Sequence, residues 1–183
     1  MIIGITGTPG TGKTSVTKLL ENDPLCQVIH LNELIKEEKL YSEVDTERDC
    51  VVADMDLVYD RVLELQDKSY PVTIVDSHLS HHIADIVIVL RTSPAKLKER
   101  LEKRKYSVEK VRENLEAEAL DIILAEAVDW CEKVFELDTT EGTVDRTFKH
   151  IGRIIKGLRR GDTEELEQEF RPGSVDWSDY FFD

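Results

Sequence analysis

The feature that most constrains this chain is a glycine-rich stretch near its N-terminus, Gly7-Thr8-Pro9-Gly10-Thr11-Gly12-Lys13-Thr14. It matches the pattern G-x-x-x-x-G-K-[ST], and it lies between a short apolar run at 2–6 and a segment typical of a helix at 14–20. This context predicts a phosphate-binding loop, because the backbone amides and the helix N-terminus then face the same anion. The alternative, a glycine-rich turn with an incidental lysine, does not account for a strand before the loop and a helix after it.

Each residue type in this loop has a physical role in holding a nucleoside triphosphate. Gly10 and Gly12 allow backbone amides to turn toward the β-phosphate with no Cβ in the way. We expect Lys13 to place its charge against the β and γ oxygens, Thr14 to offer its hydroxyl to Mg²⁺, and Ser15 to donate toward the α-phosphate.

The rest of the chain alternates between strand-like and helix-like segments. Continuous apolar runs at 72–76 and 86–90 are typical of strands that are buried on both faces of a parallel sheet. Further segments give two more strands, at 27–31 and 134–137, and helices at 32–41, 56–65, 95–103, 107–130 and 144–158, with Ser107 as an N-cap. The alternation over about 160 residues predicts an α/β fold of three layers, in which helices cover both faces of a five-stranded parallel sheet.

Two candidate functional side chains follow the strand at 72–76. Asp76 ends that strand, where a carboxylate can orient Mg²⁺ and its waters, although a solvated aspartate is the simpler alternative. His78 lies two residues further on and could position or deprotonate an attacking water. His78, His81 and His82 could instead cap a loop, and zinc would need further ligands at spacings that the sequence does not offer.

The charge of the chain is unevenly distributed. Against 24 Lys and Arg there are 38 Asp and Glu, so the net charge of −14 argues against sequence-independent binding of nucleic acid but not against a basic protein partner. Residues 91–112 reverse the sign, with nine bases against three acids, and an anionic ligand is expected there. Arg100 and Arg104 share one face of the helix, and Arg104 is placed to fold over a triphosphate. A solvated helix face is the alternative.

Other features of the sequence indicate the cellular location and the state of the cysteines. No apolar run approaches the roughly 18 residues that a membrane-spanning helix needs, and the first residues lack a basic signal region, so a cytoplasmic protein is expected. Cys26, Cys50 and Cys131 are too few and too scattered for a disulfide framework or a metal knuckle, and buried thiols are expected.

Several motifs together resemble one family. They are the loop at 7–14, Asp76-Ser77-His78, Leu90-Arg91-Thr92, the stretch from Glu99 to Tyr106 with Arg104-Lys105-Tyr106, and the helix that carries Asn114 and Glu118. This set resembles the adenylate kinase isoenzyme 6 family in its archaeal branch, over residues 1 to about 157. The loop is shared by many nucleotide-hydrolysing proteins, whereas the combination of Asp-x-His with a short Arg-x-Tyr lid is more selective.

The resemblance implies a P-loop nucleoside monophosphate kinase of broad specificity, which converts ATP and AMP into two ADP with Mg²⁺ and also hydrolyses ATP. It also implies a role in late maturation of the small ribosomal subunit, through the eleventh universal small-subunit ribosomal protein. Two alternatives remain at this point. One is a ribosome-assembly ATPase whose kinase activity is secondary, and the other is a P-loop kinase of another small metabolite.

The resemblance also assigns segments. It places a kinase domain at 1–158, with a monophosphate-binding segment at 30–53 and a lid at 103–113 that carries Arg104. Lys36 stands where relatives carry an arginine for the acceptor phosphate, and it supplies charge without a bidentate fork. Lys105 stands where a glycine often follows the lid arginine, which predicts a stiffer hinge.

The segment 159–183 is an acidic tail with several aromatic residues, and it lies outside the part that matches the family. Large apolar groups are unusual in a solvated chain end. Docking on its own domain, binding to a basic partner and a loose end are the three alternatives for this tail.

Overall fold

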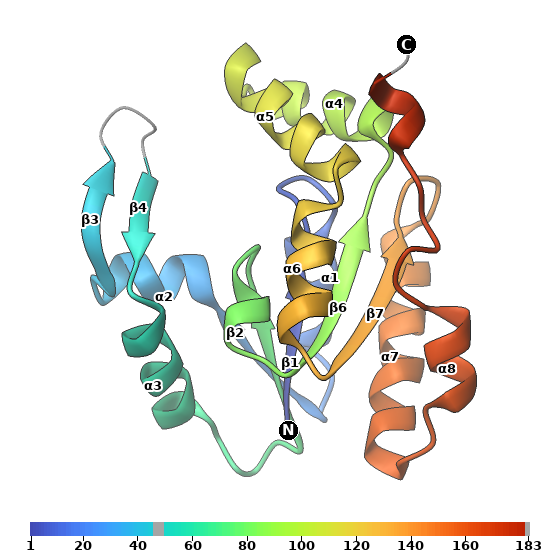
Figure 1. The fold of residues 1–183 in the computed structure, drawn as a ribbon. Helices are drawn as coiled ribbons and strands as arrows, with labels where there is room; N and C mark the ends of the chain where they lie inside the picture. The colour runs from blue at the N-terminus through green and yellow to red at the C-terminus, as the bar shows by residue number, and fades with distance from the viewer. Residues whose placement is uncertain (46–49, 182–183) are drawn as a thin grey trace.

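A five-stranded parallel sheet forms the centre of the fold. The structure is a computed structural model, and it describes residues 1–45 and 50–181. Its strands lie in the order β2-β5-β1-β6-β7 (Figure 1). Their bounds are β1 (Ile2–Thr6), β2 (Cys26–His30), β5 (Val72–Asp76), β6 (Ile86–Arg91) and β7 (Lys133–Asp138). All four strand pairs are parallel, so the carboxyl ends of the strands share one edge of the sheet. The predicted α/β fold with a five-stranded parallel sheet is confirmed.

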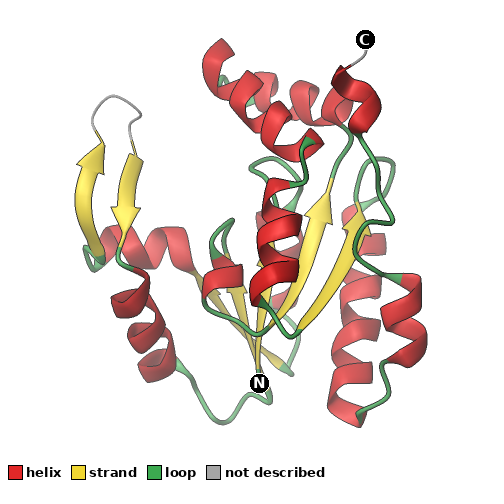
Figure 2. Cartoon of the chain, in the orientation of Figure 1, coloured by secondary structure: helices red, strands yellow, loops and turns green. Residues whose placement is uncertain are grey.

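Helices cover both faces of this sheet (Figure 2). On one face α1 (Lys13–Leu20) and α7 (Val144–Arg160) pack on apolar side chains of the strands, such as Ile3 and Ile5 of β1. On the other face α6 (Ile122–Trp130) packs against Val87 and Val89 of β6. Every residue of β5 is buried, as its continuous apolar sequence predicts for a central strand. The result is the three-layer arrangement expected from the alternating pattern.

An insert follows β2 and departs from the predicted helix at 32–41. The helix α2 covers only Leu31–Glu37, and Lys39 then takes a positive φ of 56°. Strands β3 (Tyr41–Asp45) and β4 (Cys50–Ala53) form an antiparallel pair, which leads into α3 (Met55–Leu65). The prediction of a helix up to Tyr41 is therefore wrong, because the turn at Lys39 ends it and Tyr41 pairs with Ala53. Residues 46–49 of the expected monophosphate-binding segment lie outside the described residues.

The predicted long helix at 107–130 is two helices, and its continuity is the second error. After α4 (Pro94–Lys103), α5 runs from Val108 to Ala119, and the Ser107 side chain caps it by accepting a hydrogen bond from the Lys110 amide at 3.2 Å. The helix is interrupted at Asp121, whose φ is 56°, before α6 begins. The guanidinium of Arg91 donates to the Glu118 carbonyl and to the Asp121 carboxylate, so a side chain from β6 stabilises the turn between α5 and α6.

The C-terminal segment packs on the chain's own domain over much of its described length. It contains α8 (Glu164–Glu169) and a 3₁₀ turn at Ser178–Phe181. Phe170 is buried in the core against α7, and the amides of Ser174 and Val175 donate to the Glu136 carboxylate. Residues 182 and 183 lie outside the described part. None of the helices in that part is long and apolar enough to cross a membrane.

Candidate functional site

The glycine-rich loop joins β1 to α1 at the carboxyl edge of the sheet. Gly10 has a φ of 99°, and a Cβ there would lie 2.7 Å from Leu97 Cδ1, so a larger residue would be strained and would collide with α4. Gly12 is the N-cap of α1 with a φ of 105°, in the left-handed region. The amides at the start of α1 therefore turn toward the concave side of the loop, as an anion-binding loop requires.

Lys13 extends over the loop that precedes it. Its Nζ donates to the carbonyl oxygens of Gly7 at 2.6 Å and Thr8 at 3.1 Å. Burial lowers the pKa of Lys13 to about 8, although the carboxylates of Asp76 and Glu118 oppose this shift. At neutral pH the ammonium is mostly charged, and it is desolvated in the way that strengthens its attraction for an anion.

Asp76 is buried at the end of β5, and its Oδ2 has two hydrogen-bond partners. Thr17 of α1 donates to it at 3.0 Å, and His30 Nδ1 lies 3.0 Å from the same oxygen. The other ring nitrogen of His30 is 2.9 Å from Glu21 Oε1. Burial lowers the pKa of His30, but the hydrogen bonds to Glu21 and Asp76 outweigh it, so the net shift is upward. The Asp76 carboxylate is thus held in one orientation by α1 and β2.

His30 was not among the residues selected from the sequence. It lies beside Asp76 because β2 and β5 are neighbours in register, with His30 opposite Asp76. The pairing partner of β2 is not visible in the local sequence. With the strand order known, a histidine at the carboxyl end of the adjacent strand would have been a candidate.

His78 follows β5 and is half-buried. Burial lowers its pKa to about 4, and the positive charge of Lys13 acts in the same direction. The imidazole is therefore neutral at pH 7 and can accept a hydrogen bond from a water. A base with so low a pKa removes a proton weakly, which favours orienting a water over deprotonating it.

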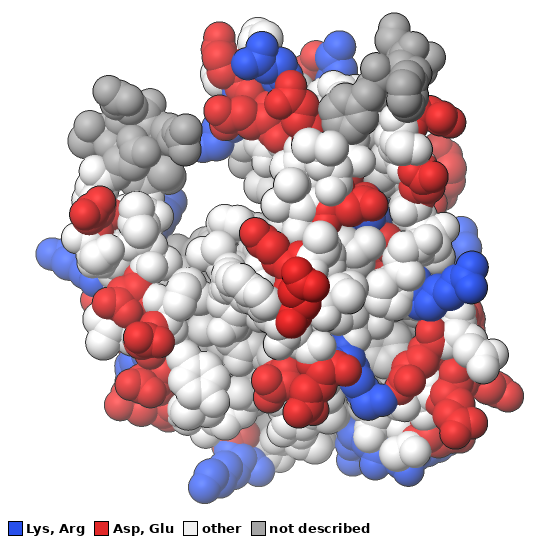
Figure 3. Space-filling model, in the orientation of Figure 1, with Lys and Arg blue, Asp and Glu red and all other residues white. Residues whose placement is uncertain are grey.

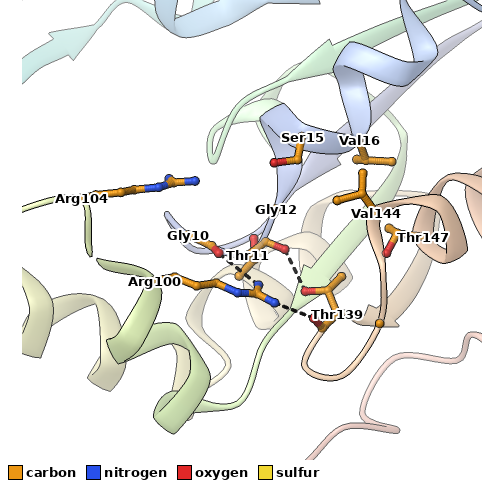
Figure 4. Close-up of a pocket in the computed structure, with 11 residues that line it drawn as sticks. Gly10, Thr11, Gly12, Ser15, Val16, Arg100, Arg104, Thr139, Val144 and Thr147 are labelled. Atoms are coloured by element: carbon orange, nitrogen blue, oxygen red, sulfur yellow. Dashed lines mark hydrogen bonds between the residues drawn. The ribbon is translucent and has the colours of Figure 1, made fainter. Parts of the chain in front are cut away.

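A cavity of about 190 Å³ opens beside the loop (Figure 4). Its lining includes Gly10, Gly12 and Ser15 of the loop region, and Arg104 extends toward it from the end of α4. The structure thus gathers four of the predicted binding residues around one cavity. Thr14 is exposed in the first turn of α1, directly beside this group.

The opposite wall of the cavity comes from the segment after β7, which no motif in the sequence indicates. Thr139, Gly142, Val144 and Thr147 line it. The Thr139 hydroxyl donates to the Thr11 carbonyl at 2.8 Å, which ties this wall to the loop. The available signal was positional, since ligands in open α/β sheets bind at the carboxyl ends of the strands.

Arg100 and Arg104 lie at the same cavity but differ in their surroundings. Arg100 donates to the carbonyls of Gly10 at 3.3 Å and Thr139 at 2.8 Å, so it connects the loop to the segment after β7. Arg104 is exposed and carries its guanidinium toward the loop (Figure 4). Lys105 follows with a φ of 60°, the left-handed conformation that glycine favours, so a lysine is strained at this position.

Lys36 does not belong to this group. It is exposed in the last turn of α2, on the insert between β2 and α3, and it is not part of the cavity lining. The insert is tied to the sheet edge elsewhere, because Ser77, directly after Asp76, donates to the Asn32 side chain at 3.0 Å.

Comparison of the sequence with known proteins shows the family of this chain. Residues 3–121 match the family model AAA_18, described as an AAA domain. A protein of Methanosarcina barkeri with the name "Putative adenylate kinase" is 58% identical over 180 residues, with 98% of each chain covered. A protein of the same name from Methanocaldococcus jannaschii is 40% identical over 184 residues, covering 100% of this chain and 96% of the other. This chain belongs to the archaeal adenylate kinase family.

Two solved structures with low sequence identity share the fold of this adenylate kinase family member. Shikimate kinase from Bacteroides thetaiotaomicron superposes with a TM-score of 0.55 at 16% identity, covering 85% of this chain and 98% of that one. The YorR protein from Bacillus subtilis, in complex with phosphorylated GDP, superposes with a TM-score of 0.58 at 12% identity, covering 87% and 98%. At these identities the likeness concerns the fold, a P-loop kinase arrangement with the 2-5-1-6-7 sheet.

Proposed function

We propose that this chain is a nucleoside monophosphate kinase of the adenylate kinase isoenzyme 6 type, which transfers the γ-phosphoryl group of ATP to AMP. The observation that carries the proposal is that Gly10, Gly12 and Ser15 line one cavity together with Arg104, a cation from the opposite side. A polyanion between them would meet backbone amides on one side and a guanidinium on the other.

The chemistry asks for positioning and charge stabilisation rather than for a protein nucleophile. The bond between the γ-phosphorus and the β–γ bridging oxygen breaks, while a phosphate oxygen of AMP forms a bond to the same phosphorus, which leaves two ADP. In this proposal the loop amides and Lys13 hold the β- and γ-phosphates, and Arg104 stabilises the charge that develops on the moving group. No side chain needs to become covalently attached.

Thr14 and Asp76 fit a magnesium ion by the nature of their donor atoms. A hydroxyl in the first turn of α1 and a carboxylate at the end of β5 are oxygen donors of the kind that Mg²⁺ takes. Asp76 receives hydrogen bonds from Thr17 and His30 on Oδ2, which fixes the orientation of the carboxylate. When bound, Mg²⁺ would neutralise charge on the β- and γ-phosphates. Contact with Asp76 through water is the expected arrangement.

The acceptor side of the proposal rests on the insert at 30–53 and the lid at 103–113. Lys36 would supply a charge near the acceptor phosphate, in place of the arginine of relatives. The lid joins α4 to α5 through the left-handed turn at Lys105. Closure about this turn would carry Arg104 onto the γ-phosphate and exclude water from the transfer.

A second function, ATP hydrolysis in ribosome assembly, is favoured by one observation. His78 carries a neutral imidazole beside Lys13, where it could accept a hydrogen bond from a water when no monophosphate is present. The proposed partner is the eleventh universal small-subunit ribosomal protein, met transiently on the precursor subunit in the cytoplasm. The net charge of −14 suits a basic partner of this kind.

Product analysis of ATP turnover with and without AMP tests the kinase proposal. We expect ADP to form at twice the amount of AMP consumed, and no acceleration by any standard nucleoside monophosphate would contradict it. His78→Ala should lower phosphate release measured without AMP, whereas His150→Ala, in α7, should not. Repeating both assays with the ribosomal protein tests whether the partner shifts turnover toward hydrolysis.

A further inference from the structure

A group of potential metal ligands lies on the face of the sheet that α6 covers, apart from the residues that line the loop cavity. It consists of His81 and His82 from the 3₁₀ turn η1 (Ser80–His82) and Glu126 from α6. One ligand atom of each residue lies within 4.8 Å of the others. His81 Nε2 and Glu126 Oε2 are 3.1 Å apart. Tetrahedral zinc ligands at bond lengths of about 2.0–2.2 Å lie about 3.3–3.6 Å apart, so the separation of this pair is within a few tenths of an ångström of the spacing of two ligands.

Packing holds these side chains in place. The turn η1 lies directly on β1, where a Cβ at Gly4 would be 3.1 Å from the Ser80 carbonyl oxygen. His81 is buried beneath it, and its ring lies 4.2 Å from the ring of His82, centroid to centroid. The half-buried His82 ring in turn contacts the ring of Trp130 of α6, with a centroid distance of 4.5 Å and an interplanar angle of 56°. Both elements that carry the ligands are therefore anchored to the sheet or to each other.

Both ring nitrogens of His81 have a polar neighbour. Thr6 Oγ1 lies 3.3 Å from His81 Nδ1, and its hydroxyl donates to the His78 carbonyl at 3.2 Å. His81 Nε2 faces the carboxylate of Glu126. When the proton of the neutral ring is on Nδ1, Nε2 has a lone pair that can bind a metal ion beside the Glu126 oxygen.

We propose that His81, His82 and Glu126 bind one divalent transition-metal ion of the zinc type, at a site separate from the nucleotide. Two imidazoles and a carboxylate are a donor set that suits Zn²⁺ or Co²⁺ and discriminates against Mg²⁺, which prefers oxygen alone. The Thr6 hydroxyl orients His81 as an outer-shell partner. The ligand atom of His82 lies within 4.8 Å of the other two, so it must move toward them to form the third bond.

The surroundings leave room for a further ligand. A second cavity, of about 310 Å³, is lined by His81 and His82 and also by Tyr59 and Trp130. With three protein ligands the ion keeps at least one open position, as in sites that bind water or a small molecule. Figure 3 shows acidic side chains on the face that carries α6, so the local potential attracts a cation to this opening.

The test is titration of the untagged chain with Zn²⁺ and Co²⁺, after chelator treatment and in an excess of Mg²⁺. We expect one ion per chain by calorimetry, with visible absorption from bound Co²⁺. We also expect quenching of Trp130 fluorescence by Co²⁺, because this ring contacts the ring of His82. The midpoint of thermal unfolding should rise with Zn²⁺ concentration, since the ion binds the folded chain.

Variants separate this site from other histidines. Glu126→Gln and His82→Ala should weaken Zn²⁺ binding by about 100-fold or more, and Thr6→Val by about 10–100-fold, as for an outer-shell partner. His150→Gln and His30→Gln are matched controls that should leave the affinity unchanged, and circular dichroism checks that each variant is folded. No binding in excess Mg²⁺ would overturn the proposal and would assign a simple hydrogen bond to His81 and Glu126. Binding that survives in both Glu126→Gln and His82→Ala would overturn it too.

Discussion

The hydroxyl of Thr8 in the phosphate-binding loop donates a hydrogen bond to Glu118 at the end of α5, 110 residues further along the chain. The other oxygen of Glu118 accepts from Arg91 at 2.8 Å, and Arg91 also donates to Glu136 at 2.8 Å. Glu136 accepts in turn from the amide of Ser174. A buried ionic network centred on the Arg91 guanidinium thus joins the loop, α5 and the C-terminal segment.

Replacing Arg91 should therefore destabilise the fold strongly. The Arg91→Leu variant would leave Glu118 and Glu136 buried without their cation, at a cost of about 3–5 kcal/mol in the free energy of unfolding. Urea denaturation followed by circular dichroism measures it. Arg112→Leu is the control, because its contact with Glu116 is exposed and 3.6 Å long, and it should change stability by about 1 kcal/mol or less. Equal losses of unfolding free energy in the two variants would show that the buried network stabilises the fold no more than an exposed ion pair does.

Lys13 should be required for turnover but not for folding. In the Lys13→Met variant the phosphates lose their closest cation, and we expect kcat/KM for ATP to fall by about 100- to 1,000-fold or more. Coupled detection of ADP gives the rate, and thermal unfolding gives the fold. Lys18→Met, on the exposed side of the same helix, should keep the activity of the parent protein. A Lys13→Met variant that retains most of its activity would show that the lysine of the loop is not required for phosphoryl transfer.

Arg104 should act mainly on kcat. Its guanidinium reaches the cavity from an exposed position, and we predict that Arg104→Ala lowers kcat by about 10³–10⁵-fold with a smaller change in KM. Steady-state kinetics at saturating AMP measures the split. Lys103→Ala removes a neighbouring charge from the last turn of α4 and should change kcat little. If both variants lose activity equally, general positive charge would explain the effect better than the position of Arg104.

The local sequence pattern was sufficient for the loop and for the five strands of the parallel sheet. It missed the antiparallel pair β3 and β4, and it failed where a distant side chain decides the structure. The apolar run of β5 and the proline at the start of α4 each carry their own signal. The break at Asp121 does not, because it depends on Arg91 from another strand. Glu126 is similar, since only the packing of α6 on η1 brings it to His81.

Cys26 and Cys131 should alkylate slowly in the folded protein. Burial raises the pKa of each thiol to about 11, with carboxylates at Asp23 and Asp85 adding to the shift. At pH 8 about one thiol in a thousand is then ionised, against about a quarter for an ordinary thiol. Peptide mapping after iodoacetamide treatment should show a rate that rises about tenfold per pH unit up to pH 10. Fast labelling of either residue at pH 8, without prior unfolding in urea, would contradict the burial.

A crystal structure with a non-hydrolysable ATP analogue and Mg²⁺ tests most directly whether the glycine-rich loop binds the triphosphate. We expect the β-phosphate oxygens to accept hydrogen bonds from backbone amides of residues 10–14. We also expect Lys13 Nζ to contact the β- and γ-phosphates and the base to lie toward Thr139 and Val144. A triphosphate bound elsewhere on the chain, with the loop amides free of it, would contradict nucleotide binding by this loop.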